Sequence, residues 1–291
     1  MSLAVLGSNL FLNALAAGTL AAVVASLVGT FVVLRAQAFA AESLLDVCFA
    51  GATGAALLGL SPVIGMAVFG AGAALGIGAL GERARERSVE IGMVVSFALG
   101  LGVLFLGIYA HGSASHSRGG IAMLFGSLLS VGPADLLRAA MLAAVTAAGL
   151  ALLYRPLLFS TVDPEGARVR GVPVRLVSTL FLVVMALAAS AAATAVGVLL
   201  ATSLMVAPAA AAVRMARRPG RAMLLSVLIG VGIAWGGILV SFLWPGRQPP
   251  VGFTVSALAA LVYFAAAAAG RTTDGRRGKT IIIGDSAETG Q

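Results

Sequence analysis

The sequence predicts an all-α, polytopic membrane protein, and its composition is the first reason. Of the 291 residues, 60% are hydrophobic and only 10% are charged, whereas soluble domains carry about a quarter charged residues. The mean hydropathy is +1.05. Long uncharged runs of Ala, Leu, Val and Gly stand where a membrane β-barrel would show alternation, as expected of spanning helices of about 20 residues. These observations exclude a soluble enzyme, a coiled coil and a disordered chain.

Apolar runs bounded by charge, Pro or Gly predict the membrane segments in order. They lie near residues 9–34, 44–60, 63–80, 91–110, 134–154, 176–193, 196–213, 222–244 and 252–270. The first is about 39 Å long at 1.5 Å per residue, so it should tilt or protrude from the hydrocarbon core. No positive charge precedes Arg35, which favours a retained helix over a cleaved signal peptide. The sixth and seventh segments have no charged loop between them, so the chain has either nine crossings or eight with one broken, re-entrant element.

Basic clusters predict the orientation of the chain. They follow the third, fifth, seventh and ninth segments, at residues 83–87, 155–175, 214–221 and 271–279, while the opposite loops carry only Arg118 and Arg247. Because cytoplasmic loops retain Lys and Arg, we expect a multi-pass membrane protein with its C-terminus inside the cell. This placement explains the net charge of +8, and with 6% aromatic residues and no continuous basic face nucleic-acid binding is not expected.

The chain is predicted to form one membrane domain, residues 1–270, followed by a polar, flexible cytoplasmic tail, residues 271–291. Within the domain, Gly72 and Gly76 are four residues apart, as are Gly232 and Gly236. This spacing lets helix backbones approach closely in lipid. We interpret these glycines as contacts between helices of the same chain; the alternative is that they form the interface between two copies of the chain.

An acidic pair is the first candidate functional feature. Glu42 and Asp46 are four residues apart at the start of an otherwise uncharged segment, hence on one helical face. Acidic groups in membrane segments are costly and mark ion or substrate pathways, and two carboxylates offer oxygen ligands to a divalent cation. The alternative is that Glu42 pairs with Arg35 at the membrane boundary and Asp46 only reaches toward water.

Other reactive residues give weaker hypotheses. His111 and His116 share one outward loop, which is either a transient metal contact or an exposed polar loop. Because Cys48 is the only cysteine, neither a disulfide nor a Cys/His zinc site is expected within the chain. Gly278-Lys279-Thr280 is similar to the end of a phosphate-binding loop, but Thr273 stands where that loop needs glycine. We therefore expect no enzyme activity and no cofactor in this chain.

The loop over residues 154–175 contains the signals of a short helix. Asp163 can cap it, with Pro164 at its first position, Glu165 in its first turn and Gly171 after its end. A capped helix between two membrane segments is suited to docking to a partner protein. The alternative is a helix that only lies at the membrane interface.

Several ordered segments resemble the permeases of metal-type ABC importers, the ABC-3 family of zinc, manganese and iron transporters. The likeness is carried by residues 31–35 (Phe-Val-Val-Leu-Arg), 124–129 with 133–136, 163–168 with 171–173, and 196–200 with 208–210. The resemblance implies half of a type II importer, with two permease copies around a central path. It further implies separate ATP-binding subunits on the cytoplasmic side, which hydrolyse ATP, and an extracellular solute-binding protein.

The resemblance also assigns roles to residues. It places Asp163, Pro164, Glu165, Ala167 and Gly171 in the coupling helix that fits a cleft on the ATPase. One departure lies in this loop, because the residue at position 170 is Arg where the family usually has Leu.

A second departure concerns the substrate. The family usually has Gly-Asp-x-x-x-His, whose Asp and His form its metal site on the path, where this chain has Ala41, Glu42 and Asp46. Losing the imidazole reduces the preference for zinc and favours oxygen-seeking ions such as manganese. The family's C-terminal Pro-Ser-Gly is also altered, to Pro-Val-Gly at 250–252. The expected function is ATP-driven import of manganese, zinc or iron. The alternatives are an ABC permease for a non-metal substrate, and a carrier or channel that needs no ATPase.

Overall fold

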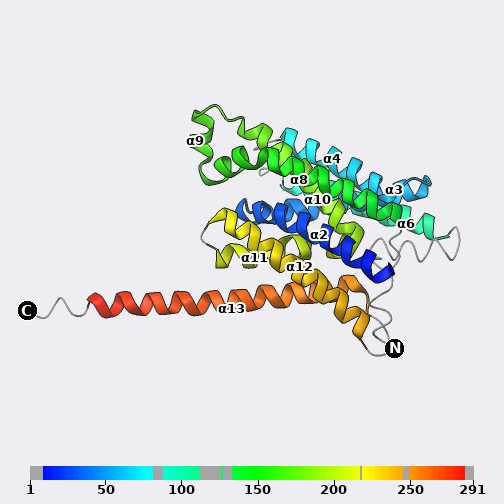
Figure 1. The fold of residues 1–291 in the computed structure, drawn as a ribbon. Helices are drawn as coiled ribbons and strands as arrows, with labels where there is room; N and C mark the ends of the chain where they lie inside the picture. The colour runs from blue at the N-terminus through cyan, green and yellow to red at the C-terminus, as the bar shows by residue number, and fades with distance from the viewer. Residues whose placement is uncertain are drawn as a thin grey trace, which may run out of the picture.

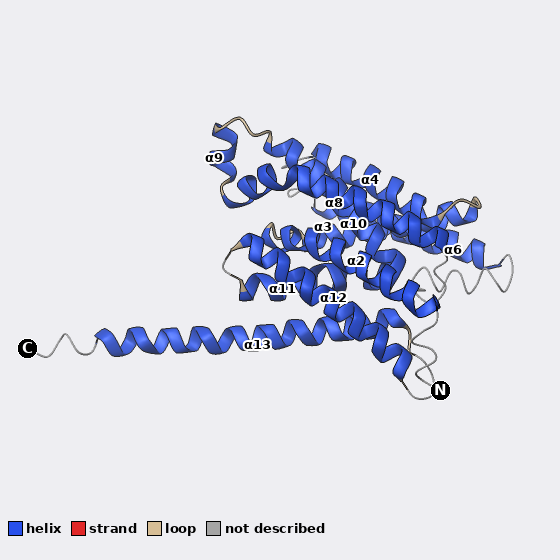
Figure 2. Ribbon diagram, viewed as in Figure 1, coloured by secondary structure: helices blue, strands red, loops and turns tan. Residues whose placement is uncertain are grey.

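The computed structural model describes residues 9–80, 88–111, 126, 133–216, 218–244 and 249–285. In this part of the chain every regular element is a helix (Figure 2), which confirms the all-α prediction. Helices satisfy their own backbone polar groups, as a lipid environment requires. Eight of the described helices are long and apolar enough to cross a membrane.

Ten helices follow one another along the described chain. They are α2 (Asn9–Leu34), α3 (Ala38–Leu57), α4 (Pro62–Leu80), α6 (Ser88–His111), α8 (Pro133–Val162), α9 (Pro164–Val169), α10 (Val174–Val196), α11 (Val198–Met215), α12 (Pro219–Leu243) and α13 (Val251–Asp285). The end of α13 and the start of α2 lie at opposite ends of the bundle (Figure 1). We call the end that holds α9 the arginine-rich end; its described arginines are Arg35, Arg155, Arg168, Arg170, Arg175, Arg214, Arg218 and Arg221.

Proline marks the start of four of these helices: Pro62, Pro133, Pro164 and Pro219 are each the first residue of their helix. The first helical residue needs no intrahelical hydrogen-bond donor, and the fixed φ of proline suits that position. The helix starts are therefore encoded locally in the sequence.

The centre of the bundle is formed by α2, α10 and α11. α2 packs against α8, α10, α11 and α12, while α10 also contacts α3 and α4, and α11 also contacts α3 and α13. Within the most apolar stretch of α2 and of α10, 67% of residues are buried, compared with 6% for α6. α6 therefore lies at the periphery and leaves most of its surface for lipid or another chain.

Helices α3 and α4 contact each other closely through Gly51 and Gly65. Neither glycine belongs to the pairs, Gly72/Gly76 and Gly232/Gly236, that the sequence spacing had indicated. A Cβ on Gly51 would stand 2.4 Å from the carbonyl oxygen of Gly65, and a Cβ on Gly65 would stand 2.2 Å from that of Gly51. By contrast, Gly72, Gly76 and Gly232 have no other atom within 4 Å of that position. The expectation of internal packing is wrong for these three, because they lie on the outer faces of their helices.

Three helix limits differ from the sequence prediction. α3 begins at Ala38 rather than near residue 44, so both acidic residues are helical. α8 runs through Pro156 to Val162, so the first part of the 154–175 loop is helix. α13 continues to Asp285, where a flexible tail was expected from residue 271. The helix continues the alanine-rich stretch that precedes residue 271, and the flexibility of the tail stays a prediction.

The sixth and seventh predicted segments are two helices separated by a single residue. Gly197, between α10 and α11, has φ +91°, a conformation that side-chain-bearing residues rarely adopt. The apolar part of α11, Leu200–Met215, is about 24 Å long at 1.5 Å per residue, shorter than a hydrocarbon core of about 30 Å. α10 alone is long enough to cross a membrane, and α11 is a shorter helix that returns to the arginine-rich end; the number of crossings, eight or nine, stays a prediction.

Candidate functional site

The acidic pair lies on one face of α3, within its apolar length. Glu42 is exposed and Asp46 is half-buried. Both belong to the candidate membrane span Ala38–Leu57, with Asp46 about 12 Å along the helix axis from its first residue. The two side chains are adjacent because residues four apart face the same way on a helix. The structure does not show the alternative pairing of Glu42 with Arg35: Nη2 of Arg35 donates a hydrogen bond to Oγ of Ser178 over 2.7 Å.

Helix α11 adds a hydroxyl group to the pair. Oγ1 of Thr202 donates a hydrogen bond to Oε2 of Glu42. A close backbone contact with α2 fixes the position of α11 along its axis. A Cβ on Gly29 of α2 would stand only 1.9 Å from the carbonyl oxygen of Met205 in α11. Met205 lies about one helical turn after Thr202. The close backbone contact therefore also fixes the hydroxyl that faces Glu42.

This arrangement offers oxygen ligands only. Two carboxylates and one hydroxyl suit a hard cation, and divalent ions of this type take six or more oxygens. No group of three or more His, Cys, Asp or Glu side chains that could hold a metal occurs among the described residues. A cation at this face would therefore need further ligands besides these three side chains.

Only one of the two histidines of the outward loop lies among the described residues. His111 is the last residue of α6 and is exposed, and its Nδ1 lies 2.6 Å from the carbonyl oxygen of Gly107 in the same helix. His116 lies outside the described residues. The hypothesis of a transient metal contact therefore stays untested.

The predicted short helix forms as the sequence signals indicate. The backbone N–H of Gly166 donates to Oδ1 of Asp163 over 2.8 Å, Pro164 is the first residue of α9, and Glu165 lies in its first turn. At the other end Gly171 has φ +79°, which glycine adopts at low cost. The capped helix is thereby confirmed; its role in docking stays a prediction.

Packing gives α9 one fixed face and one free face. Ala167 is completely buried, and α9 contacts α8 and α10. On the outer side Val169 is 89% exposed, and Glu165 and Arg168 are also exposed. The next residue, Arg170, places its guanidinium 5.4 Å from the ring centre of Phe159 in α8, so the family's usual leucine is replaced by a residue that still packs on an apolar surface.

Two features of the site were missed from the sequence. Thr202 has no motif around it, and its contact with Glu42 joins residues 160 positions apart. Arg35 was considered only as an alternative partner of Glu42, and its hydrogen bond to Ser178 of α10 was not predicted. Only the packing of α10 and α11 against α2 determines both neighbours.

Comparison with known proteins gives concordant matches. A model of the ABC 3 transport family matches residues 8–269. The chain is 29% identical over 271 residues to the manganese transport system membrane protein MntC of Halalkalibacterium halodurans, covering 92% of this chain and 91% of that protein. It is 29% identical over 257 residues to the chelated iron transport system membrane protein YfeD of Yersinia pestis, covering 86% and 84%.

A solved structure shares the fold. The structure titled PsaBC from Streptococcus pneumoniae in complex with Fab matches with a TM-score of 0.78 and 24% identity, covering 89% of this chain and 91% of that one. The match extends over nearly the whole length of both chains.

Proposed function

The chain belongs to the ABC 3 transport family, and we propose that it is the membrane-spanning permease of an ATP-driven importer for a divalent metal ion. The observation that carries the proposal is the carboxylate pair of α3, held inside a membrane span next to the hydroxyl of Thr202. Charged side chains at such positions are expensive and accompany ion or substrate pathways. The relatives named for manganese and iron transport support the same substrate class.

The donor set supports manganese as the first candidate among the metals. Glu42, Asp46 and Thr202 present oxygen atoms, and no imidazole or thiolate is added by the described residues around them. Oxygen ligands suit Mn²⁺, whereas zinc binds well to sites with nitrogen or sulfur. Because the metal ion is the transported substrate, its site has to bind it weakly enough to release it.

Helix α9 is the proposed contact for the ATP-binding subunit. Its exposed residues Glu165, Arg168 and Val169 stand at the arginine-rich end, which the positive-inside rule places in the cytoplasm together with the C-terminus. ATP hydrolysis then belongs to that separate subunit. A second copy of the chain, an extracellular binding protein and the bacterial cytoplasmic membrane complete the proposed assembly.

A continuous path of helices supports coupling between α9 and the acidic pair. Ala167 anchors α9 against its neighbours, and the short stretch after Gly171 leads directly into α10. α10 ends at the Gly197 break, and α11 carries Thr202 to Glu42. Movement of α9 by a closing ATPase would therefore move α10 and change the contact made by Thr202.

The experiment is uptake by proteoliposomes that contain this chain with its ATP-binding subunit. We expect ATP-dependent accumulation of Mn²⁺, with Zn²⁺ and Fe²⁺ measured in parallel, and loss of uptake in the variant that combines Glu42→Ala with Asp46→Ala. Thr53→Val is the matched control, because the Thr53 hydroxyl bonds only to carbonyls of its own helix. If the double variant takes up every metal at the wild-type rate, Glu42 and Asp46 are not the metal-contact residues. Uptake that needs no ATPase would favour a stand-alone carrier.

A further inference from the structure

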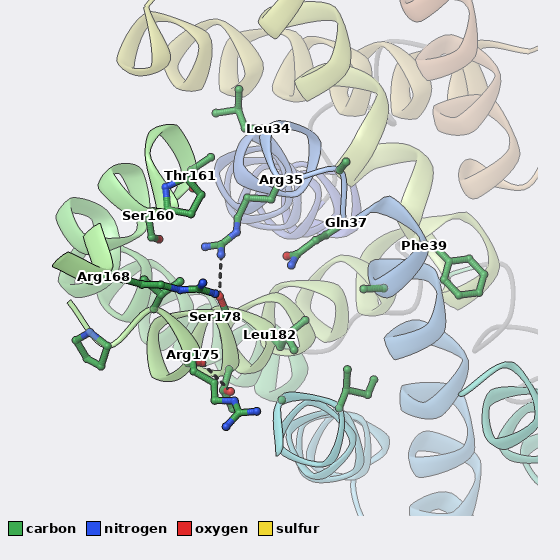
Figure 3. Close-up of a pocket in the computed structure, with 18 of the residues that line it drawn as sticks. Leu34, Arg35, Gln37, Phe39, Ser160, Thr161, Arg168, Arg175, Ser178 and Leu182 are labelled. Carbon is green, nitrogen blue, oxygen red and sulfur yellow. Dashed lines mark hydrogen bonds between the residues drawn. The ribbon is translucent and has the colours of Figure 1, made fainter. Parts of the chain in front are cut away.

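A large cavity at the arginine-rich end is separate from the acidic pair. Its volume is about 1160 Å³, and it lies between the turn joining α2 to α3, the end of α4, and the segment from the end of α8 to the start of α10. Neither Glu42 nor Asp46 lines it. Figure 3 shows the side chains of Arg35 and Gln37, from the turn between α2 and α3, and of Arg168, from α9, extending toward its centre.

The charge of this cavity is of one sign. Arg35, Arg168 and Arg175 line it, and no Asp or Glu occurs among the described residues that line it. Three guanidinium groups repel a divalent cation. The cavity therefore does not suit the transported metal, and its complementary ligand is an anion.

Arg35 is the most buried of the three arginines and has unused hydrogen-bonding capacity. Its Nη2 donates to Oγ of Ser178 over 2.7 Å, and its guanidinium carbon lies 5.7 Å from the ring centre of Phe181. Its Nη1 is buried without a hydrogen-bond partner among the described residues. Burial lowers the pKa of Arg35, because removal from water disfavours the charged form of the guanidinium group.

A second buried polar atom lies in the same lining. Oε1 of Gln37 has no hydrogen-bond partner among the described residues. A ligand that satisfies both residues needs an anionic oxygen for Arg35 and a hydroxyl that donates to Gln37. A phosphate group that carries a hydroxylated substituent meets both requirements.

The rest of the lining combines an apolar wall with the hydroxyl side chains of Ser43, Ser160, Thr161, Ser178 and Thr179. The apolar wall favours a lipid as the source of that phosphate. Leu34, Phe39, Ile77 and Leu182 form part of the wall, and Phe39 is 68% exposed. These residues stand where membrane helices end, at the depth at which acyl chains meet headgroups. Basic pockets between membrane helices on the cytoplasmic side are suited to anionic headgroups.

We propose that this cavity binds the phosphate headgroup of an anionic phospholipid, with Arg35 and Gln37 at its base and Arg168 and Arg175 at its rim. The acyl chains would lie along Leu34, Phe39 and Ile77. A bound lipid would neutralise the cavity and connect α9, through Arg168, to the turn between α2 and α3. The inference is independent of metal transport.

The test measures lipid binding to the purified, delipidated full-length chain by native mass spectrometry. The probes are dioleoylphosphatidylglycerol, zwitterionic dioleoylphosphatidylcholine and inorganic phosphate. The key variant combines Arg168→Gln and Arg175→Gln, two exposed side chains whose replacement leaves the bundle core intact. The matched control combines Arg218→Gln and Arg221→Gln, which remove the same charge from exposed residues outside the cavity.

We expect phosphatidylglycerol to bind at least about tenfold more tightly than phosphatidylcholine. The Arg168/Arg175 variant should lose about twenty-five-fold in affinity, since each basic residue contributes about fivefold. The control should stay within about twofold of wild type, as expected for charges away from the site. Equal binding of the two lipids, or a key variant that matches the control, would overturn the proposal. Displacement of phosphatidylglycerol by millimolar inorganic phosphate would assign the cavity to a free anion instead.

Discussion

The acidic face of α3 and the arginine-rich end differ in sign, depth and packing. Glu42 and Asp46 lie within a membrane span and contact α11, whereas Arg35, Arg168 and Arg175 gather where helices end, around a cavity. A carboxylate inside a span is costly and has to be compensated, but an arginine at the boundary remains partly hydrated. The difference indicates two tasks: contact with a cation along the membrane span, and contact with a partner and anions at the end.

The largest expected effect tests the chemistry of the acidic face. Asp46→His gives the pair an imidazole, which binds zinc better than a carboxylate does. We expect the ratio of zinc to manganese uptake to rise by about tenfold or more, measured by metal accumulation in proteoliposomes. Asp46→Asn is the control, because it removes the charge without supplying an imidazole. An unchanged ratio in Asp46→His would show that Asp46 does not contact the metal.

The next effect tests the arginine-rich end alone. Asp163→Ala removes the cap of α9, which is held by one hydrogen bond of 2.8 Å to Gly166. Loss of a cap costs about 1 kcal/mol, so ATP-driven uptake should fall by about fivefold while metal binding to the permease stays unchanged. Asp163→Asn keeps an oxygen acceptor and should retain most activity. A drop in metal binding in Asp163→Ala would show that α9 and the acidic face of α3 do not act separately.

A smaller effect tests the link between them. Thr202→Val removes the hydroxyl that donates to Glu42 while keeping the shape of the side chain. Loss of one hydrogen bond to a charged group costs about 1.5 kcal/mol or less when the carboxylate can reach water, so we expect uptake to fall by about threefold to tenfold. Thr202→Ser restores the donor and should restore uptake. Equal rates for the Val and Ser variants would remove Thr202 from the site.

The smallest effect is expected at Arg170, the departure from the family in the α9 loop. Arg170→Gln loses the contact with the Phe159 ring, 5.4 Å away. An exposed contact of this kind contributes about 0.5–1 kcal/mol, so thermal unfolding should shift by only a few degrees, with metal uptake near wild type. Uptake lost as severely as in Asp163→Ala would instead show that Arg170 itself contacts the partner.

Local signals in the sequence predicted much of this structure. The first membrane segment, residues 9–34, has the limits of α2, and the cap and glycine of α9 formed as expected because both act within a few residues. The start of α3 was misplaced because Ala38–Ser43 contains polar residues that an apolar run excludes. Its true start depends on packing against α4 and α10.

Contacts between distant segments could not be predicted in the same way. Gly51 and Gly65 meet because α3 and α4 form a hairpin, whereas the i, i+4 spacing of Gly72 and Gly76 carries no information about which face turns inward. The contact of Thr202 with Glu42 and the cavity around Arg35 likewise require the three-dimensional arrangement. Local patterns specify the helices, and tertiary packing assembles the sites.

The most direct measurement is equilibrium binding of Mn²⁺ to the purified permease without any ATPase. It compares wild type with the isosteric double variant Glu42→Gln plus Asp46→Asn, and with Asp163→Ala at the other region. The account predicts that the double variant loses at least about tenfold in affinity, while Asp163→Ala binds as wild type does. Unchanged Mn²⁺ affinity in the double variant would contradict the assignment of the acidic face to the cation.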